Sequence, residues 1–362
     1  MAEKVRVGVI GTSWWVDMMY VPSLNSHPGA EVVAVCGRSA ERAGAVAAKF
    51  GRARVFADYR EMIASGGLDA VVIAAPDDVH REMVLAAADA GLHILCEKPL
   101  ANTLADAVEM QQRVEAAGVT NMVLFTWRWQ PHWRYLKHLV DTGYVGRCLR
   151  ARFAFIEGIA FNKGYKWRFD GRRGSGVAGD LGSHMIDMAH WFLGDAATVS
   201  ADLKVFADQS AEADPSPLPV NDACLIALGM RNGAQVLIDS SAVTYLADQD
   251  VKIIVELAGD EGTLEAEHIF FGKDAGVTIR GARRGATSFA QLTVPDEYLA
   301  GGVARDAVFD PYLKQSAGAR LFIDAILDGR PASPDFADGV RMQRVLDAAI
   351  RSAEAGRVVR LD

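Results

Sequence analysis

The chain has 362 residues, a length that suggests two domains. Hydrophobic residues make up 50% and charged residues 23%, so the composition excludes a disordered chain. The net charge of −8 argues against a nucleic-acid-binding protein, which needs a basic face, although a local group of arginines can still hold a small anion.

Strands and helices alternate over the first third of the chain. Short apolar or β-branched runs predict strands at residues 5–10, 31–36, 54–57, 68–75, 93–96 and 122–125, with helices at 40–50, 59–64, 78–90 and 104–117. Asp78 is expected to cap the third helix, and Gly91 and Gly118 are expected to end the last two. The alternation predicts parallel pairing, so residues 1–126 should form a doubly wound sheet with ligands at the carboxyl ends of its strands.

The pattern changes after residue 126. A helix is predicted at 132–141, and strands are predicted at 148–155, 223–230, 234–242, 251–258 and 263–267. Asn232 and Gly233 join two of these strands, and Asn-Gly predicts a β-hairpin in which both residues have positive φ. Consecutive strands favour antiparallel pairing, so residues 127–362 are predicted to form an α+β domain. Residues 207–219, with three prolines, are predicted to form an exposed loop.

The first predicted strand ends in the loop Gly11-Thr12-Ser13-Trp14. The dinucleotide fingerprint places glycines at positions 11, 13 and 16, but Ser13 and Val16 occupy the last two. Gly11 can still form the tight turn, and Ser13 can let the backbone approach a pyrophosphate. The alternative is an ordinary strand-to-helix turn. The place of the loop after the first strand of an alternating pattern favours the dinucleotide site.

The end of the second predicted strand bears on the choice of cofactor. A site selective for NAD would place Asp or Glu there to bind the ribose 2′-hydroxyl, whereas this chain has Arg38 and Ser39, with Arg42 one turn later. These side chains could hold the 2′-phosphate of NADP through charge-assisted hydrogen bonds. The alternative is that Arg38 is a solvated surface arginine. The sequence therefore predicts NADP, with NAD as a second possibility.

Glu97-Lys98-Pro99 follows the fifth predicted strand, inside the expected ligand crevice. A lysine there can reach a substrate bound beside the nicotinamide and favour an alkoxide-like transition state. Pro99 restricts the turn that directs Lys98. The tripeptide alone is a weak signal, and its place at a strand end gives it weight.

A third cluster lies in residues 179–194, which read as a helix ended by a glycine. On that helix Asp180, His184 and Asp187 fall on one stripe. A histidine beside a carboxylate is a suitable proton carrier near neutral pH. One alternative is a buried structural histidine, and another is a zinc site. No third soft ligand supports zinc, so no metal is expected.

Taken together, these motifs resemble the Gfo/Idh/MocA (glucose–fructose oxidoreductase / inositol dehydrogenase) family over essentially the whole chain. The matching segments are 75–80, 91–99, 167–170, 179–187, 338–339 and 348–352. The resemblance implies a Rossmann domain followed by an open, mainly antiparallel sheet that binds substrate and often mediates oligomerisation. It also implies NAD(P)-dependent oxidation or reduction of a hydroxyl on sugars, cyclitols or related polyols. The chain departs from the family pattern at Ser13, Val16 and Trp127.

The resemblance also implies roles for individual residues. Lys98, Asp180 and His184 match the catalytic group: Lys98 stabilises the oxyanion, and Asp180 orients His184, which carries the proton. The cofactor-binding residues are then expected to be Gly11, Thr12, Ser13, Trp14, Arg38, Ser39, Arg42, Pro76, Asp77, His80, Glu97 and Lys98. The substrate-binding residues are expected to be Arg128, Trp129, Trp167, Arg168 and Asp187.

Our interpretation is an NADP-preferring dehydrogenase or reductase of a sugar or polyol, forming a homo-oligomer such as a dimer or tetramer. Two alternatives stay open. One is a non-catalytic NADP-sensing regulator of the same fold, and the other is a reductase of dihydrodiols or sugar nucleotides. Retention of Lys98, Asp180 and His184 together argues against a regulator, and a substrate panel would separate the reductases.

The cysteines and the chain's start bear on the compartment. Cys36, Cys96, Cys148 and Cys224 lie far apart with no CxxC pair, and the N-terminal residues run into a strand without a signal-peptide core. No apolar stretch is long enough to span a membrane. We therefore expect reduced thiols in a cytoplasmic protein with no membrane or nucleic-acid partner.

Overall fold

The computed structural model describes residues 4–162, 167–209, 217–305 and 307–361. The chain forms two compact units. The first comprises Met1–Phe125, Gly301–Val303 and Phe309–Arg341, and the second comprises Thr126–Ala300, Ala304–Val308 and Met342–Asp362.

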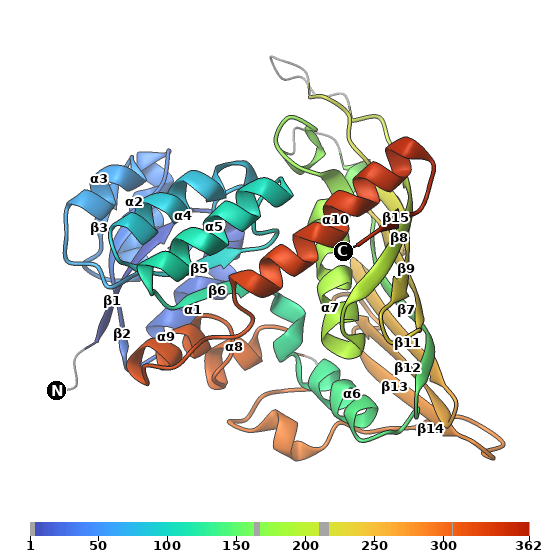
Figure 1. The fold of residues 1–362 in the computed structure, drawn as a ribbon. Coiled ribbons are helices and arrows are strands. Elements are labelled where there is room, and N and C mark those ends of the chain that lie inside the picture. The colour runs from blue at the N-terminus through green and yellow to red at the C-terminus, as the bar shows by residue number, and fades with distance from the viewer. Residues whose placement is uncertain (1–3, 163–166, 210–216, 306, 362) are drawn as a thin grey trace. The chain divides into compact units, whose positions relative to one another are not determined.

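The first unit is built on a parallel sheet of six strands in the order β3-β2-β1-β4-β5-β6 (Figure 1). The strands are β1 (Val5–Ile10), β2 (Ala30–Cys36), β3 (Arg54–Phe56), β4 (Ala70–Ile73), β5 (His93–Glu97) and β6 (Asn121–Leu124). The chain winds outward from β1 in one direction and from β4 in the other, so the sheet's topological switch lies between these two strands. Doubly wound sheets bind their ligands at this switch. The predicted Rossmann sheet is confirmed.

Helices connect these strands. They are η1, a π-helical turn (Val16–Tyr20), α1 (Val21–Asn25), α2 (Ala40–Lys49), α3 (Tyr59–Ala64), the 3₁₀ turn η2 (Asp77–Val79), α4 (His80–Asp89), α5 (Leu104–Ala117), α8 (Asp310–Lys314) and α9 (Ala319–Leu327). The prediction that Asp78 caps a helix was wrong, because α4 begins only after Val79 and has no side-chain cap. The 3₁₀ turn comes first and buries Asp77 and His80, which are 5% and 1% exposed.

Residues 309–341 pack in the first unit, although the sequence analysis placed them in the second domain. Phe336 and Val340, at the start of α10 (Phe336–Ala355), belong to the same buried cluster as Ile94 of β5. Long-range burial decides this assignment, and no local pattern in the sequence signals it. The functions predicted for the two domains stay predictions.

The second unit is built on a sheet of nine strands in the order β14-β13-β12-β11-β7-β10-β9-β8-β15 (Figure 1). The strands are β7 (Cys148–Glu157), β8 (Ala196–Lys204), β9 (Ala223–Met230), β10 (Gln235–Ser241), β11 (Val251–Gly259), β12 (Gly262–Ile269), β13 (Gly276–Arg283), β14 (Ala290–Gln291) and β15 (Val359–Arg360). Strands β7 and β10 pair in parallel, and the other neighbours pair antiparallel. The predicted α+β unit with a mainly antiparallel sheet is confirmed.

The hairpin predicted at Asn232-Gly233 joins β9 and β10, but its turn differs from the prediction. Gly233 has a φ of 89°, whereas Asn232 is not among the residues with positive φ. The N–H of Gly233 donates to the carbonyl of Met230 at 3.0 Å, and the N–H of Met230 donates to the carbonyl of Ala234 at 2.9 Å. This is a three-residue loop with one left-handed glycine, so only one positive φ is needed.

The helical elements of the second unit are the 3₁₀ turns η3 (Thr126–Trp129), η4 (Ile159–Phe161), η5 (Trp167–Phe169) and η7 (Asp296–Leu299), α6 (Pro131–Asp141), the π-helical turn η6 (Ala178–Gly182), α7 (Ser183–Leu193) and most of α10. Every residue of α7 except Trp191 is buried. The helix packs against β7 and β10, which places the residues around His184 over one face of the sheet. Of the loop predicted at 207–219, residues 210–216 lie outside the described residues.

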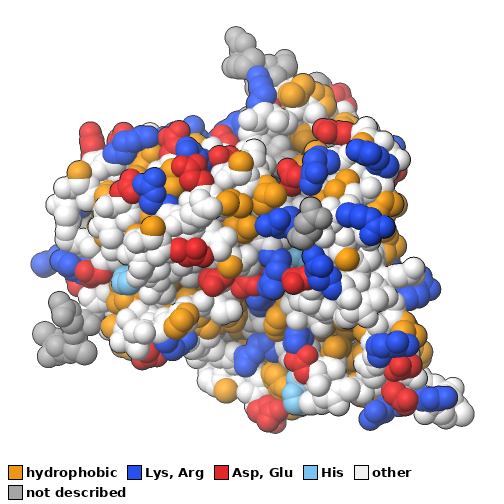
Figure 2. All heavy atoms as spheres, viewed as in Figure 1, with side chains coloured by type: hydrophobic (Ala, Val, Ile, Leu, Met, Phe, Trp, Pro, Cys, Tyr) orange, Lys and Arg blue, Asp and Glu red, His pale blue; other side chains and the backbone are white. Residues whose placement is uncertain are grey.

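Charged side chains of both signs are interspersed over the face drawn in Figure 2. All four cysteines are buried and unpaired, and burial raises the pKa of Cys224 to about 12. In the described part of the chain, no helix has the length and apolar character needed to cross a membrane.

Candidate functional site

The loop after β1 lies at the topological switch of the parallel sheet. Gly11 has a φ of 132°, and a Cβ atom at this position would lie 2.4 Å from the carbonyl oxygen of Ala74. The N–H of Gly11 donates to the carbonyl of Cys36 at 2.9 Å, which ties the loop to the end of β2. Only glycine fits between the neighbouring strand ends, so Gly11 makes the tight turn that the first glycine of a dinucleotide fingerprint makes.

Beyond Gly11 the loop departs from the three-glycine fingerprint. Val16, at the position of the third glycine, is fully buried and begins the π-helical turn η1. The third glycine normally permits close packing of helix against strand, and a valine there needs more room. In this chain the helix that begins at Val16 is π-helical over its first turn. Thr12 and Ser13 are half-buried in the loop, and Trp14 is 63% exposed.

The end of β2 carries the residues predicted to select the cofactor. Arg38 and Arg42 are exposed there, and no carboxylate stands at residues 36–39. The hydroxyl of Ser39 caps α2 by accepting a hydrogen bond from the backbone N–H of Arg42 at 3.3 Å. Ser39 therefore has a structural partner already, and the two arginines are the groups available to a phosphate.

His80 lies between the ends of β4 and β5. Its Nε2 is 2.9 Å from the carbonyl oxygen of Ala75, and its Nδ1 is 3.1 Å from the carbonyl oxygen of Pro99. A neutral imidazole has a single N–H, so it donates to one of these carbonyls at a time. Burial lowers the pKa of His80. The ring is 1% exposed, which disfavours the predicted direct contact with a cofactor and gives His80 a place between the two strand ends.

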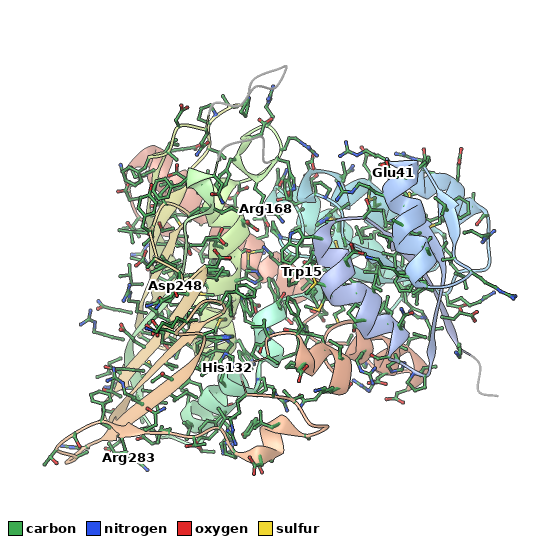
Figure 3. The ribbon with its side chains drawn as sticks, turned by 180° about the vertical axis from the view of Figure 1, so that it is seen from behind. Trp15, Glu41, His132, Arg168, Asp248 and Arg283 are labelled. Carbon is green, nitrogen blue, oxygen red and sulfur yellow. The ribbon has the colours of Figure 1, made fainter. Side chains whose placement is uncertain are left out.

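Glu97 is the last residue of β5, and its carboxylate is buried. Its Oε1 accepts hydrogen bonds from Trp15 Nε1 at 2.6 Å and from the Tyr20 hydroxyl at 2.7 Å (Trp15 is labelled in Figure 3). Its Oε2 accepts a hydrogen bond from the backbone N–H of Lys98 at 3.3 Å. Burial raises the pKa of Glu97, and these hydrogen bonds and the Lys98 charge oppose that rise.

Lys98 follows at the carboxyl edge of the parallel sheet, where it is half-buried. The peptide bond between Lys98 and Pro99 is cis. Asp77, which is buried, and Pro76, which is half-buried, lie at the end of the neighbouring strand β4. The carboxyl ends of β1, β2, β4 and β5 therefore hold the residues predicted to bind the cofactor.

In the second unit, the residues predicted to form the proton-transfer cluster lie on one continuous helical run. Asp180 belongs to the π-helical turn η6, and His184 and Asp187 belong to α7. Asp180 Oδ2 lies 3.0 Å from Arg168 Nε, and the Arg168 guanidinium lies 4.5 Å from the Trp167 ring centroid. Arg168, which is labelled in Figure 3, thus has two predicted site residues as neighbours.

Arg128 and Asp187 form a bidentate ion pair. Arg128 Nε donates to Asp187 Oδ2 at 2.9 Å, and Arg128 Nη2 donates to Asp187 Oδ1 at 2.5 Å. The Asp187 side chain is only 3% exposed. This pair joins the turn η3 to α7, so both residues have a structural partner, and their contact with substrate stays a prediction.

Aromatic rings surround His184, which is 6% exposed. Its ring centroid lies 5.5 Å from that of Trp127 and 5.8 Å from that of Phe155. Trp127 in turn stacks on Phe270 with a centroid distance of 4.9 Å. The predicted proton carrier therefore lies in a largely apolar wall. The predicted substrate residue Trp129 is also buried, at 7% exposure.

The same aromatic layer continues into a pair of buried histidines. The ring centroids of His132 and His268 are 4.4 Å apart, and Phe270 lies 4.2 Å from His268 (His132 is labelled in Figure 3). His132 Nε2 and both ring nitrogens of His268 have no hydrogen-bond partner among the described residues. Burial lowers the pKa of His268 to about 3 and that of His132 well below its usual value of 6.5.

This pair predicts acid sensitivity of the fold. Between pH 6.5 and about pH 3, the unfolded chain binds a proton at His268 that the folded chain does not, so stability falls as the pH falls. The expected slope is about 1.4 kcal/mol per pH unit for this group. Urea unfolding from pH 7 to pH 4.5 should show a shallower loss in His268→Phe than in wild type. His138 is an exposed histidine on α6, so the free energy of unfolding of His138→Gln should change with pH as that of wild type does. Equal slopes of unfolding free energy against pH in all three proteins would contradict the prediction.

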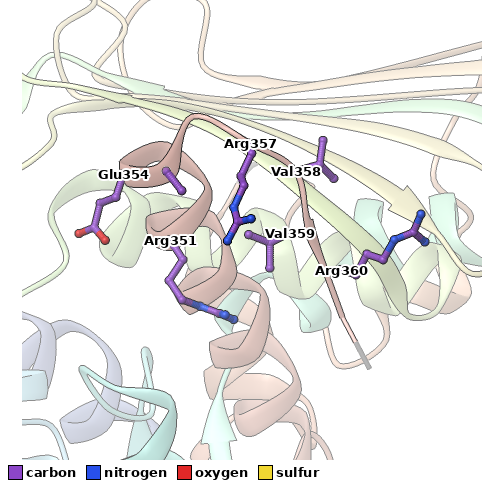
Figure 4. Close-up of a pocket in the computed structure, with 7 residues that line it drawn as sticks. Arg351, Glu354, Arg357, Val358, Val359 and Arg360 are labelled. Atoms are coloured by element: carbon purple, nitrogen blue, oxygen red, sulfur yellow. The ribbon is translucent and has the colours of Figure 1, made fainter.

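Two surface pockets lie apart from the predicted site residues. One, of about 540 Å³, is lined by residues of the end of α10 and of β15, among them Arg351, Arg357 and Arg360 (Figure 4). The other, of about 520 Å³, lies over β8, β9 and β10. In the described ranges, no group of three or more histidine, cysteine, aspartate or glutamate residues is arranged to hold a metal ion.

Trp15 and Tyr20 belong to no motif that predicts a role for them, and Trp127 stands out in the sequence only as a departure from the family pattern. Trp15 and Tyr20 contact Glu97 across more than 70 residues of chain, which no local pattern signals. Trp127 had one usable signal, its place directly before the predicted substrate residue Arg128.

Comparison with known proteins adds two family matches. Residues 5–125 match the model of the GFO/IDH/MocA oxidoreductase family with an NAD-binding Rossmann fold, and residues 133–265 match the GFO/IDH/MocA C-terminal domain. Levoglucosan dehydrogenase of Pseudarthrobacter phenanthrenivorans is 29% identical over 342 residues, which cover 86% of this chain and 85% of that protein. D-xylose 1-dehydrogenase (NADP(+)) 2 of Haloferax volcanii is 26% identical over 362 residues, covering 98% and 99% of the two chains.

The solved structures include similar proteins of the same length. A levoglucosan dehydrogenase in complex with NADH and levoglucosan has a TM-score of 0.88 and 25% identity to this chain, and the match covers 99% of each. The similarity therefore extends over both units.

Proposed function

The chain belongs to the GFO/IDH/MocA oxidoreductase family and is an NAD(P)-dependent oxidoreductase, and from this premise we propose that it oxidises or reduces a hydroxyl-bearing carbon of a sugar, cyclitol or related polyol. The observation that carries the proposal is its match, over 99% of both chains, to a dehydrogenase solved with NADH and levoglucosan. The Gly11 turn at the topological switch fits a dinucleotide, as the cofactor of such an enzyme requires.

The proposed roles are those that the family resemblance implies for each residue. When bound, the nicotinamide supplies the hydride acceptor or donor. His184 takes the hydroxyl proton during oxidation and returns it during reduction. Asp180, which precedes His184 on the same helical run, orients His184. The Lys98 ammonium stabilises the oxygen as negative charge develops on it.

A cofactor-reduction screen tests the proposal. The pure protein is incubated with NADP or NAD and with a panel of sugars, sugar acids, inositols and 1,6-anhydrosugars, and the absorbance of the reduced cofactor is followed. We expect turnover with at least one sugar or cyclitol. Cofactor binding without turnover on this panel, on dihydrodiols or on sugar nucleotides would favour a non-catalytic regulator instead. Turnover confined to the last two classes would favour the alternative reductases.

The proposed preference for NADP rests on the end of β2. Arg38 and Arg42 are exposed there without a carboxylate at residues 36–39, so two cations are available to bind a 2′-phosphate. Hydrogen bonds to charged groups contribute about 1.5–3 kcal/mol, and the exposure of Arg38 favours the low end of that range. At about 1.4 kcal/mol per factor of ten, roughly tenfold tighter binding of NADP than of NAD is expected.

Replacing Arg38 with Asp should reverse this preference. The carboxylate repels the 2′-phosphate of NADP and accepts a hydrogen bond from the free ribose 2′-hydroxyl of NAD. Quenching of tryptophan fluorescence gives both dissociation constants. Arg52→Asp, the same charge change at another exposed position of the first unit, is the matched control and should leave the ratio unchanged. Equal binding of both cofactors by wild type, or an unchanged ratio in Arg38→Asp, would show that Arg38 does not contact the ribose.

A homo-oligomer is part of the same proposal. One face of the nine-stranded sheet exposes apolar side chains, among them Leu225 of β9 and Leu237 of β10, which are 49% and 39% exposed. The other face packs against α7. We propose that a second copy of the chain covers the exposed face, and light scattering of the pure protein would reveal a monomer if that is wrong.

A further inference from the structure

Trp15, in the loop after β1, and Tyr20, in the turn η1, both donate hydrogen bonds to Oε1 of the buried Glu97 at the end of β5. We propose that Glu97 is a positioning residue. It holds the loop after β1 against the turn that carries Lys98, through the hydrogen bonds it accepts from Trp15 and Tyr20. The inference rests on the proposed function in one respect, namely that the loop after β1 binds the cofactor.

The π-helical turn brings the side chains of Trp15 and Tyr20 together. Trp15 and Tyr20 are five residues apart, and in an α-helix such residues point roughly 140° away from each other. In a π-helix the hydrogen bonds run from residue i to residue i+5, so residues five apart lie on nearly the same face. The bond from the N–H of Val21 to the carbonyl of Val16 has this spacing. The replacement of the third glycine by a buried valine and the double contact with Glu97 therefore belong to one local structure.

The carboxylate binds both segments at once. Oε1 accepts from Trp15 at 2.6 Å and from Tyr20 at 2.7 Å, while Oε2 accepts from the backbone N–H of Lys98 at 3.3 Å. Glu97 is 8% exposed and Tyr20 is fully buried, so water does not replace a lost partner easily. A displacement of the loop would leave a buried carboxylate short of donors, which links the position of the loop to that of Lys98.

The hydrogen-bond pattern separates two effects. Loss of a donor at Oε1 frees the loop, and the expected result is weaker cofactor binding. Loss of the acceptor at Oε2 disturbs the Lys98 backbone, and the expected result is slower turnover. In Glu97→Gln the amide oxygen can still accept from Trp15 and Tyr20, but its NH₂ group then faces the N–H of Lys98. The two kinds of variant are thus expected to change different quantities, cofactor affinity in one and kcat in the other.

The test uses Trp15→Phe, Tyr20→Phe and Glu97→Gln. Trp15→Phe and Tyr20→Phe should each raise the dissociation constant of NADPH about tenfold, with kcat at saturating cofactor within about threefold of wild type. Glu97→Gln should lower kcat about tenfold and leave the dissociation constant within about threefold. Tyr59→Phe is the matched control, because its hydroxyl also contacts a carboxylate of the first unit, Glu82 at 3.5 Å, and it should match wild type. Unchanged NADPH affinity in Trp15→Phe and Tyr20→Phe would overturn the proposal.

A second measurement needs neither turnover nor cofactor. With ¹⁵N-labelled indoles, the seven tryptophans give seven N–H resonances, and Trp15→Phe identifies that of Trp15. We expect this resonance to exchange slowly with solvent in wild type and to shift in Tyr20→Phe, whose change lies on the shared oxygen. A Trp15 N–H resonance that exchanges fast with solvent and does not shift in Tyr20→Phe would overturn the proposal that Glu97 holds the loop. If wild type binds no nicotinamide cofactor, the proposed function fails, and this resonance still decides whether Glu97 holds the loop.

Discussion

Replacing Lys98 with Met is expected to lower kcat by on the order of 10²-fold or more, while the affinity for the cofactor stays near that of wild type. The methionine side chain is similar in length and removes the positive charge that we propose stabilises the oxyanion. Lys98 stands half-buried at the end of β5, where partial exclusion of water strengthens such an interaction. Steady-state kinetics with saturating cofactor, together with a binding titration, measure the two quantities separately.

Lys49→Met serves as the control for this experiment. Lys49 is a lysine of the first unit that pairs with Asp17 at 2.6 Å at the surface, so its loss should leave kcat unchanged. Near-normal turnover of Lys98→Met would remove Lys98 from the mechanism.

Replacing His184 with Ala is expected to reduce kcat/KM by roughly 10²- to 10⁴-fold, the range typical of general acid–base groups. The variant should also lose the change of kcat/KM with pH near neutrality, because no imidazole remains to take the hydroxyl proton. The pH profile of kcat/KM for the sugar substrate identified in the screen is the measurement.

His138→Ala, at an exposed histidine of α6, is the matched control and should keep the wild-type profile. Circular dichroism shows whether His184→Ala, a change within a buried helix, still folds. A folded His184→Ala with an unchanged pH profile would assign proton transfer to another group, with Asp180 and Lys98 as the candidates.

Much of the fold could be predicted because its local patterns agree with its tertiary structure. The apolar run that contains Ala70–Ile73 is buried on both faces of the sheet, as a central parallel strand must be. Gly118 takes a φ of 65° and ends α5, as a glycine after a helical pattern predicts. Where local patterns compete, prediction failed: Asp78 is a good capping residue, but burial of Asp77 and His80 shifts the start of α4 beyond it.

The site was predictable to the extent that its residues lie at strand ends and in motifs. Gly11 and Lys98 lie at the strand ends where they were expected. Their partners were not predictable, because a hydrogen bond such as that from Tyr20 to Glu97 depends on how two distant segments pack. The ion pair between Arg128 and Asp187 is of the same kind, since the two residues were predicted as separate substrate contacts.

By itself, the sequence determined the alternation of strands and helices in the first unit, the glycine turn after β1 and the absence of a carboxylate at residues 36–39. These are local properties, set by side-chain periodicity and by the φ that only glycine adopts freely. Only the tertiary structure decided that residues 309–341 join the first unit, that η1 is π-helical and that Glu97 has Trp15 and Tyr20 as donors. Each of these depends on which buried groups meet, and buried polar groups adopt the arrangement that satisfies their hydrogen bonds rather than the one that local propensity favours.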